Sequence, residues 1–129
     1  MGKNKVLLID DEEDFCSLVK MHLEAIGDFS VDTATSGSEG LQLAEKTKPD
    51  VIVLDILMPE MDGLQVLSKL KQNRHTMEIP VIMLSGKDDE SLKIKASELY
   101  DENYLTKPID AKVLKTKIEE ILKIRRGGS

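Results

Sequence analysis

The stretch that decides the fold is residues 51–63, which read VIVLDILMPEMDG. It begins with four consecutive aliphatic residues, and such an uninterrupted run is typical of a strand buried on both faces. The run stops at Asp55, and residues 59–63 have the composition of a loop that precedes a helix. The stretch therefore predicts a strand, a loop and a helix in that order, with an acidic residue at the carboxyl end of the strand.

The same alternation of short apolar runs and amphipathic stretches continues on both sides of this segment. Further strands are predicted at Val6–Ile9, Phe29–Thr33, Pro80–Leu84 and Asn103–Leu105. Helices are predicted at Phe15–Ile26, Ser38–Lys48, Leu64–Asn73, Asp89–Leu99 and Asp110–Leu122. Because parallel neighbours need helical crossovers, five strands that alternate with five helices predict an α/β fold with a parallel sheet and helices on both faces.

Apolar residues at helical spacing mark the helix faces that we expect to be buried. In the first helix these are Phe15, Leu18, Val19, Leu23 and Ile26, and in the last helix they are Leu114, Ile118, Ile121 and Leu122. The strand at Phe29–Thr33 alternates apolar and polar residues, which favours a position at or near a sheet edge. We expect one domain at residues 1–122 and a tail or linker at residues 123–129.

Charge and composition argue against several classes of protein. Lys and Arg number 18 against 24 Asp and Glu, a net charge of −6, so a general nucleic-acid-binding surface is not expected and another domain would have to reach DNA. The apolar runs are too short to span a bilayer, and the lone Cys16 can form no internal disulfide. We expect a soluble cytoplasmic protein without direct contact to nucleic acid or membrane, in which Cys16 packs on a helix.

Polar residues follow four of the predicted strands. They are Asp10 and Asp11 after the first strand, Asp55 after the third, Ser85 after the fourth and Lys107 after the fifth. Ligands of open α/β sheets bind beyond the carboxyl ends of the strands. We therefore expect all five side chains to converge on one crevice.

Three carboxylates in one crevice need a compensating cation, because each pair repels by about 4 kcal/mol at roughly 4 Å and an effective dielectric constant of about 20. Magnesium prefers oxygen ligands and suits such a site, and Lys107 would supply a second positive charge. Each residue also has a simpler interpretation, in which the acids favour a helix N-terminus, Asp55 and Ser85 belong to turns, and Lys107 is solvated. Their coincidence at the ends of four strands favours a common site.

With these residues the chain resembles the receiver domains of two-component response regulators. The resemblance extends from about Lys5 to Leu122 and depends on four motifs: LIDDE at 8–12, VLDILMPEMDG at 53–63, SG at 85–86 and YLTKP at 104–108. It implies a flavodoxin-like, doubly wound sheet with strand order 2-1-3-4-5 and five helices. It also implies a phosphorylation-dependent switch, not an enzyme with sustained turnover.

The resemblance implies a role for each acid. Asp55 would accept a phosphoryl group from a histidine kinase or a histidine phosphotransfer protein. Asp10, Asp11, Asp55 and the backbone carbonyl of Leu57 would bind Mg²⁺. The downstream effector is not implied.

The resemblance also implies how the phosphoryl group is held and how the signal leaves. Ser85 and Lys107 would contact the phosphoryl oxygens, and the bond from Lys107 to Pro108 would be cis. Ser85 and Tyr104 would act as switch residues that reshape the face of the fourth helix, the fifth strand and the fifth helix. The protein would be a monomer or a weak dimer through that face.

Three positions depart from the pattern of the family. Tyr100 and Asp101 stand where a pair of small residues is usual, and Ile109 replaces a common phenylalanine. Leu57 places an apolar side chain two residues after Asp55, where it could either shield a phosphoryl group from water or merely pack the loop.

Three alternatives remain open. A phosphatase of the haloacid dehalogenase type would need a second aspartate at the position of Leu57. A flavin binder would need Ser, Thr and Gly in the first loop, where Asp10 to Asp14 would repel a phosphate. A relay stage or a receiver module of a hybrid kinase, without its own output, would keep the receiver chemistry.

Overall fold

A computed structural model describes residues 2–58, 61–86 and 103–125 of the chain. The strands are β1 (Asn4–Ile9), β2 (Phe29–Ala34), β3 (Val51–Asp55), β4 (Val81–Ser85) and β5 (Asn103–Thr106). The helices are α1 (Glu13–Ile26), α2 (Gly37–Thr47), α3 (Gly63–Gln72) and α5 (Ala111–Arg125). The helix predicted at Asp89–Leu99 lies outside the described residues, as do Tyr100 and Asp101.

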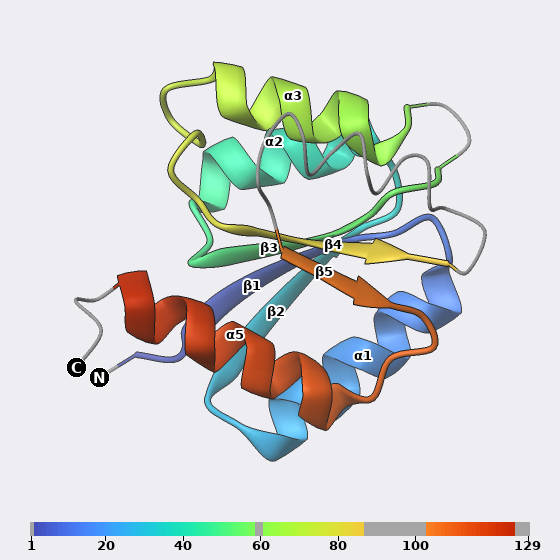
Figure 1. The fold of residues 1–129 in the computed structure, drawn as a ribbon, viewed down its shortest axis with the longest axis vertical. Coiled ribbons are helices and arrows are strands. Elements are labelled where there is room, and N and C mark those ends of the chain that lie inside the picture. The colour runs from blue at the N-terminus through green and yellow to red at the C-terminus, as the bar shows by residue number, and fades with distance from the viewer. Residues whose placement is uncertain (1, 59–60, 87–102, 126–129) are drawn as a thin grey trace.

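The strands form one parallel sheet in the order β2-β1-β3-β4-β5 (Figure 1), which confirms the predicted topology. The three inner strands are the aliphatic runs, and every residue of β3 and β4 is buried. β2 is an edge strand, and its buried residues alternate with more exposed ones, as the sequence predicted. The other edge strand, β5, is only partly buried along its length.

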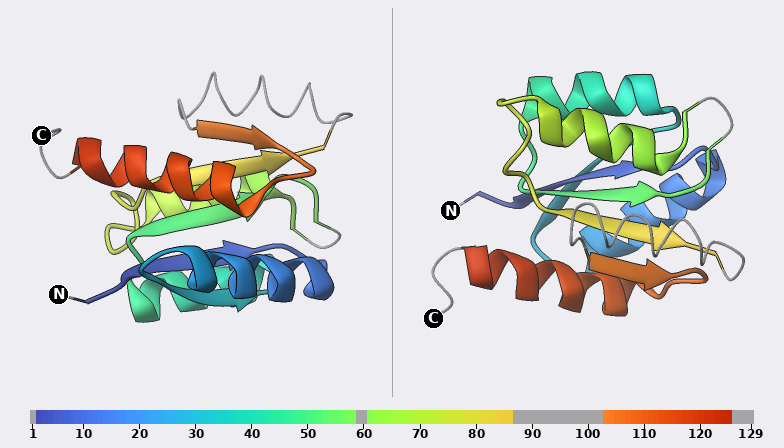
Figure 2. Two further views of the ribbon diagram at one scale, coloured as in Figure 1. Left: turned by 90° about the horizontal axis from the view of Figure 1, so that it is seen from below. Right: turned by 45° about the horizontal axis from the view of Figure 1, so that its top comes forward.

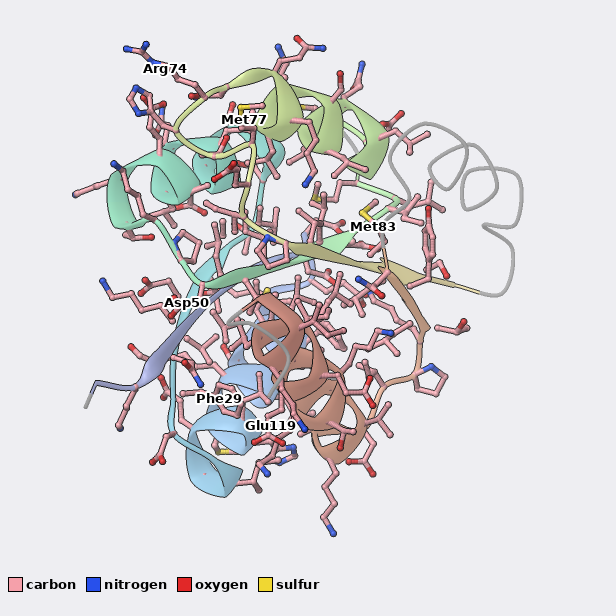
Figure 3. All side chains as sticks on the ribbon, turned by 60° about the vertical axis from the view of Figure 1, so that its left-hand side comes forward. Phe29, Asp50, Arg74, Met77, Met83 and Glu119 are labelled. Atoms are coloured by element: carbon pink, nitrogen blue, oxygen red, sulfur yellow. The ribbon has the colours of Figure 1, made fainter. Side chains whose placement is uncertain are left out.

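The helices cover the two faces of the sheet in pairs, with α1 and α5 on one face and α2 and α3 on the other (Figure 2). Successive strand residues point to opposite faces, so Leu8 belongs to the core under α1 and α5, whereas Leu7 belongs to the core under α2 and α3. Phe29 and Met83, labelled in Figure 3, lie in these two cores respectively. The sheet therefore separates two hydrophobic cores.

The buried face of α1 differs from the predicted one. Cys16, Val19 and Leu23 are buried, whereas Leu18 and Ile26 are 49% and 36% exposed. The three buried positions are spaced by three and four residues and form one narrow stripe, from which Leu18 is displaced by about 100° around the helix axis. The prediction included apolar residues from two neighbouring faces of α1, but only one stripe is buried. The expected packing role of Cys16 is confirmed.

The buried face of α5 agrees with the prediction. Leu114, Ile118, Ile121 and Leu122 are all buried. The helix begins after Asp110, whose carboxylate accepts a hydrogen bond from the backbone N–H of Lys112 at 2.7 Å, as expected of a residue that caps a helix. The helix continues to Arg125, three residues beyond the predicted end of the helix at Leu122. The division of the chain into domain and tail stays a prediction.

α2 begins one residue earlier than predicted, at Gly37, and its N-cap is Ser36 and not Ser38. The hydroxyl of Ser36 accepts a hydrogen bond from the backbone N–H of Glu39 at 3.2 Å. Within this helix Gly40 lies directly over β1, where an added Cβ would come within 2.5 Å of Ile9 Cδ1. This glycine costs helix propensity but allows α2 to pack closely on the strand that leads to Asp10.

Candidate functional site

The carboxyl ends of the inner strands lie side by side, as the sequence predicted. In the sheet register Ile9 pairs with Leu54, Asp55 with Leu84, and Ser85 with Thr106. Backbone hydrogen bonds continue past the strand ends, from Ile56 N to Leu84 O at 3.0 Å and from Lys107 N to Ser85 O at 2.8 Å. The parallel ladder thus carries the polar residue that follows each strand to one edge of the sheet.

The carboxylates of Asp10, Asp11 and Asp55 form one cluster, with a ligand atom of each within 4.8 Å of the other two. Asp10 is fully buried and Asp55 is 5% exposed, whereas Asp11 is exposed. The Oδ1 atom of Asp10 accepts a hydrogen bond from the backbone N–H of Glu12 at 2.9 Å, which fixes its orientation. In this cluster Asp10 and Asp55 are therefore buried, and Asp11 faces the solvent.

Lys107 provides the positive charge of the cluster. Its Nζ atom lies 2.7 Å from Asp10 Oδ2 and 3.7 Å from Asp55 Oδ2. A third carboxylate, that of Glu12, lies 3.3 Å away, and the ring centroid of Phe15 lies 4.5 Å from the same nitrogen. The lysine side chain is 20% exposed, so this ammonium is surrounded mainly by protein.

Burial and neighbouring charges shift the pKa of both Asp55 and Lys107. Burial, followed by the negative charge of Asp10, raises the pKa of Asp55 from 3.8 to about 7, although Lys107 and the backbone of Leu57 oppose the change. Burial lowers the pKa of Lys107, but Asp10, Asp55 and Glu12 outweigh it and raise this pKa overall. Among the described residues, the acidic cluster therefore holds more negative charge than Lys107 can neutralise.

The start of α3 fixes the backbone around Asp55. Asp62 and Gln65 form a capping box, in which each side chain accepts a hydrogen bond from the other's backbone N–H, at 2.9 and 3.1 Å. A Cβ atom on Gly63 would lie 2.5 Å from the carbonyl oxygen of Asp55 and 2.6 Å from the Cα of Ile56. Glycine is required at this position because α3 begins in direct contact with the backbone that carries the acid.

The other predicted site residues take different positions. Ser85 is buried at the end of β4, beside Asp55 in the sheet and bonded through its carbonyl to Lys107 N. Tyr104 pairs with Met83, two residues before Ser85, and packs half-buried against the core under α2 and α3. The side chain of Leu57 is 51% exposed, so it is not buried in the loop. The bond between Lys107 and Pro108 is cis, as the resemblance implied.

Two contacts of Lys107 were missed by the sequence reasoning. Glu12 was interpreted only as one of several acids near the start of a helix, and Phe15 only as part of the buried stripe of α1. The available signal was their position close after Asp10 and Asp11, since Glu12 is the N-cap of α1 and Phe15 lies in its first turn. Neither residue type by itself indicates a contact with a lysine that, for Glu12, is 95 residues away in the sequence.

Cys16 also borders the cluster, but it has the properties of a packing residue. Its thiol is buried and donates a hydrogen bond to the backbone carbonyl of Asp10 at 3.3 Å. Burial, followed by the charge of Asp10, raises the pKa of this thiol to about 12. It is therefore protonated near neutral pH and is a poor nucleophile.

The donor set of the cluster fits a hard divalent cation. Three carboxylates offer oxygen ligands within 4.8 Å of one another, and one of them is open to solvent. Magnesium accepts such ligands and usually keeps several waters and substrate oxygens in its shell. Asp10, Asp11 and Asp55 are therefore the residues of the described chain that could hold it.

The helices of the described residues are all too short or too polar to cross a lipid bilayer.

Comparison with known proteins gives consistent results. Residues 6–119 match the family model of the response regulator receiver domain. The chain is 39% identical over 119 residues to the alkaline phosphatase synthesis transcriptional regulatory protein PhoP of Bacillus subtilis, covering 92% of this chain and 48% of that protein. It is 33% identical over 120 residues to the transcriptional regulatory protein SrrA of Staphylococcus aureus, covering 93% and 48%. The chain thus spans about half the length of these curated relatives.

Solved structures show the same similarity. A response regulator receiver domain protein from Clostridium thermocellum matches with a TM-score of 0.87 and 32% identity, over 95% of this chain and 97% of that one. The receiver domain of the Francisella response regulator 1452 matches with a TM-score of 0.82 and 32% identity, over 96% and 99%. The relatives named as transcriptional regulators conflict with the expected absence of nucleic acid among the partners, although that expectation concerned only direct contact by this chain. The expectation was based on the net negative charge of this chain. That charge describes the surface of this chain and not the half of each relative that this chain does not match.

Proposed function

This chain belongs to the response regulator receiver domain family, and from that premise we propose that it is a switch controlled by phosphorylation of Asp55. The observation that carries the proposal is the position of this carboxylate, which is nearly buried beside two other acids and 3.7 Å from Lys107 Nζ. Capping or turn formation would not require a buried acid of raised pKa among other acids. Acceptance of a phosphoryl group would use all of these features.

The transfer reaction follows from these groups. An oxygen of the ionised Asp55 carboxylate attacks the phosphorus of a phosphohistidine on a partner kinase or phosphotransfer protein. The new P–O bond forms as the P–N bond breaks, and the electron pair of that bond leaves with the histidine nitrogen, which is then protonated from water. Lys107 and the hydroxyl of Ser85 would stabilise the negative phosphoryl oxygens, so the protein mainly positions groups and balances charge.

Asp10, Asp11, Asp55 and the backbone carbonyl of Leu57 would hold a magnesium ion in this site. When bound, the ion would supply positive charge that reduces the repulsion among the acids and an incoming phosphoryl group. Asp10 is oriented for this role by the backbone N–H of Glu12. Asp11, being exposed, lies where an ion would arrive from solvent.

Reset of the switch would use water. Water attacks the phosphorus of the acyl phosphate, inorganic phosphate leaves, and the Asp55 carboxylate is restored. The exposed side chain of Leu57 would hinder that attack, because it is apolar and does not bury itself in the loop. Leu57→Asn should then raise the dephosphorylation rate, and an unchanged or lower rate would contradict this role.

Output would involve Ser85 and Tyr104. Movement of the Ser85 hydroxyl toward new phosphoryl oxygens would change the space available beside Met83, the residue that pairs with Tyr104 in the sheet. The partly buried edge strand β5 would then pass the change to its face with α5, which could also support a weak dimer. This is a shift between two populations, biased by local electrostatics.

We propose that this chain acts in the cytoplasm and that a histidine kinase or a histidine phosphotransfer protein is its upstream partner. By analogy with the relatives, the output would be transcriptional, through a nucleic-acid-binding part beyond the half that this chain spans. A relay module or a receiver of a hybrid kinase remains the second candidate, because its pocket would have the same composition. Detection of phosphotransfer onward from Asp55 to a histidine would favour that candidate.

The central test is covalent phosphorylation. The protein is incubated with acetyl phosphate and Mg²⁺, and its intact mass is measured beside Asp55→Asn and the matched control Asp32→Asn, which changes an exposed acid on β2. We expect the parent and Asp32→Asn to gain one phosphoryl group and Asp55→Asn to gain none. Equal gain in Asp55→Asn would refute the assignment, and sustained hydrolysis of small phosphate esters would favour a phosphatase.

A further inference from the structure

We infer that Phe15 is a positioning residue that holds the Lys107 ammonium over the pocket, an inference that rests on the proposed function. The ring centroid of Phe15 lies 4.5 Å from Lys107 Nζ, while the same nitrogen contacts Asp10 at 2.7 Å and Asp55 at 3.7 Å. A cation at this distance from an aromatic ring is attracted by the negative face of the ring. Phe15 is thus an uncharged residue that contacts the Lys107 ammonium beside the three carboxylates.

Lys107 needs such a contact because its ammonium can also turn toward another acid, Glu12, at the solvent side of the cluster. Glu12 is 65% exposed and lies 3.3 Å from Nζ, so it attracts the ammonium toward solvent and away from Asp55. A long four-carbon side chain can follow either attraction at little cost. The position of the ammonium therefore depends on the balance between the exposed acid and the contacts that face the pocket.

The aromatic ring has a property that an additional carboxylate would not have. A lysine ammonium has three N–H donors and no acceptor, and a carboxylate would occupy one of these donors. A ring attracts the charge as a whole, so it takes none of the N–H donors, which stay available for the neighbouring carboxylates and for an oxygen of an incoming phosphoryl group. Phe15 would hold the lysine in place without competing with the phosphoryl group for its donors.

Phe15 itself is well anchored. It is the third residue of α1, in the turn that follows Asp10 and Asp11, and it is only partly exposed. Its apolar surface packs against the core under α1 and α5, together with Leu105 and Ile109. The ring is therefore held by the fold on one side while it contacts the flexible lysine on the other.

The test compares variants that keep or remove the ring. The rate of phosphorylation by acetyl phosphate and Mg²⁺ is measured for the parent, Phe15→Leu, Phe15→Tyr and Leu18→Ala, the last being a control that alters the exposed side of the same helix. We expect Phe15→Leu to lower the rate about fivefold, the size of a typical cation–π contact at a partly buried site. Phe15→Tyr and Leu18→Ala should keep a rate close to that of the parent. Phe15→Met, which also lacks the ring, replaces Phe15→Leu if urea unfolding shows that Phe15→Leu does not fold.

A double-mutant cycle separates positioning from a general structural effect. In a Lys107→Ala background, Phe15→Leu should cause no further loss of rate, because the ring acts through the lysine. A second readout is the NMR shift of the Lys107 ε-methylene protons, which a facing ring displaces in the parent and in Phe15→Tyr but not in Phe15→Leu. A fivefold loss that persists without Lys107, or a parental rate in Phe15→Leu, would overturn the inference and leave the proposed function intact. A parent that takes up no phosphoryl group would overturn both.

Discussion

Two lysines of this protein take part in ion pairs of similar length, but in different surroundings. Lys20 on α1 lies 3.0 Å from Glu24, and the two side chains together bond to the outer edge of β2, where Lys20 donates to the carbonyl of Val31 and Glu24 accepts from its N–H. Lys107 lies 2.7 Å from Asp10 but also faces Asp55 and Glu12. Lys20 and Glu24 are matched one to one, whereas in the described part of the chain Lys107 is shared by several acids.

The difference separates an ion pair that ties α1 to β2 from the ion pair of the proposed site. At Lys20 one positive and one negative group satisfy one N–H and one carbonyl, and backbone and lysine contacts lower the pKa of Glu24. In the acidic cluster burial, followed by the negative charge of Asp10, raises the pKa of Asp55 to about 7, so the folded protein disfavours the charged form of this carboxylate. An imbalance of this kind is relieved by a ligand, and it indicates a site more reliably than the length of any salt bridge.

The largest expected effect comes from removing the cation of the unbalanced cluster. Lys107→Met should lower the free energy of unfolding by about 3 kcal/mol, because it leaves the fully buried Asp10 without its partner. Urea unfolding in the presence of a chelator measures the loss. Mg²⁺ should restore part of it, and a loss no greater than that of Lys20→Met would contradict the contrast between the two lysines.

The second prediction concerns pH. The pKa of Asp55 in the folded state is raised from 3.8 to about 7, so its contribution to stability is complete below about pH 4 and is lost as the pH rises through about 7. Asp55→Asn carries no such charge and should be more stable than the parent by about 2 kcal/mol near pH 8 without divalent cations. The gap should shrink toward pH 4 in the same unfolding assay. A gap that is constant across this range would show that the charge of Asp55 is not its cause.

The third prediction is stabilisation by the metal. At a concentration ten times its Kd, Mg²⁺ should stabilise the parent by about 1.4 kcal/mol, because it binds the folded cluster and not the unfolded chain. Thermal unfolding with and without Mg²⁺ at constant ionic strength measures this. Asp11→Asn should respond less than the parent, and Lys20→Met should respond equally. An equal response of all three proteins would place metal binding elsewhere.

The smallest effect is expected at the matched pair. Lys20→Met should cost about 0.5 kcal/mol, since its side chain is 45% exposed and ion pairs at such positions contribute little. The cost should fall further at high salt, and the phosphorylation rate should stay at the parental value. A change in that rate would show that the outer edge of β2 is coupled to the pocket.

Most of the fold and the outline of the pocket could be predicted from the sequence, for identifiable reasons. Aliphatic runs without polar interruption mark the inner strands, and a parallel sheet brings their carboxyl ends to one edge. The positions of Asp10 and Asp55 follow from those two facts alone, whereas the position of Lys107 depended on the short strand predicted at Asn103–Leu105. The strand order came from the resemblance, because the crossover pattern allows more than one order.

The remainder depends on three-dimensional detail that has no local signal. The true stripe of α1 was missed because its apolar residues lie on two neighbouring faces, and only packing against α5 selects between them. The contacts of Glu12 and Phe15 with Lys107 depend on the course of one long, flexible side chain. Helix ends were misplaced by a residue or more where two serines compete as caps or where a helix simply continues, as α5 does to Arg125.

The glycine at the start of α3 has a mechanical consequence. A side chain between a helix and a strand can absorb small displacements by changing rotamer. At Gly63 there is no side chain, and the helix rests directly on the main chain of residues 55 and 56. A shift of that main chain by a few tenths of an ångström would therefore move the first turn of α3 as a rigid body. Strain produced at residue 55 would reach the surface along α3 as well as through β5.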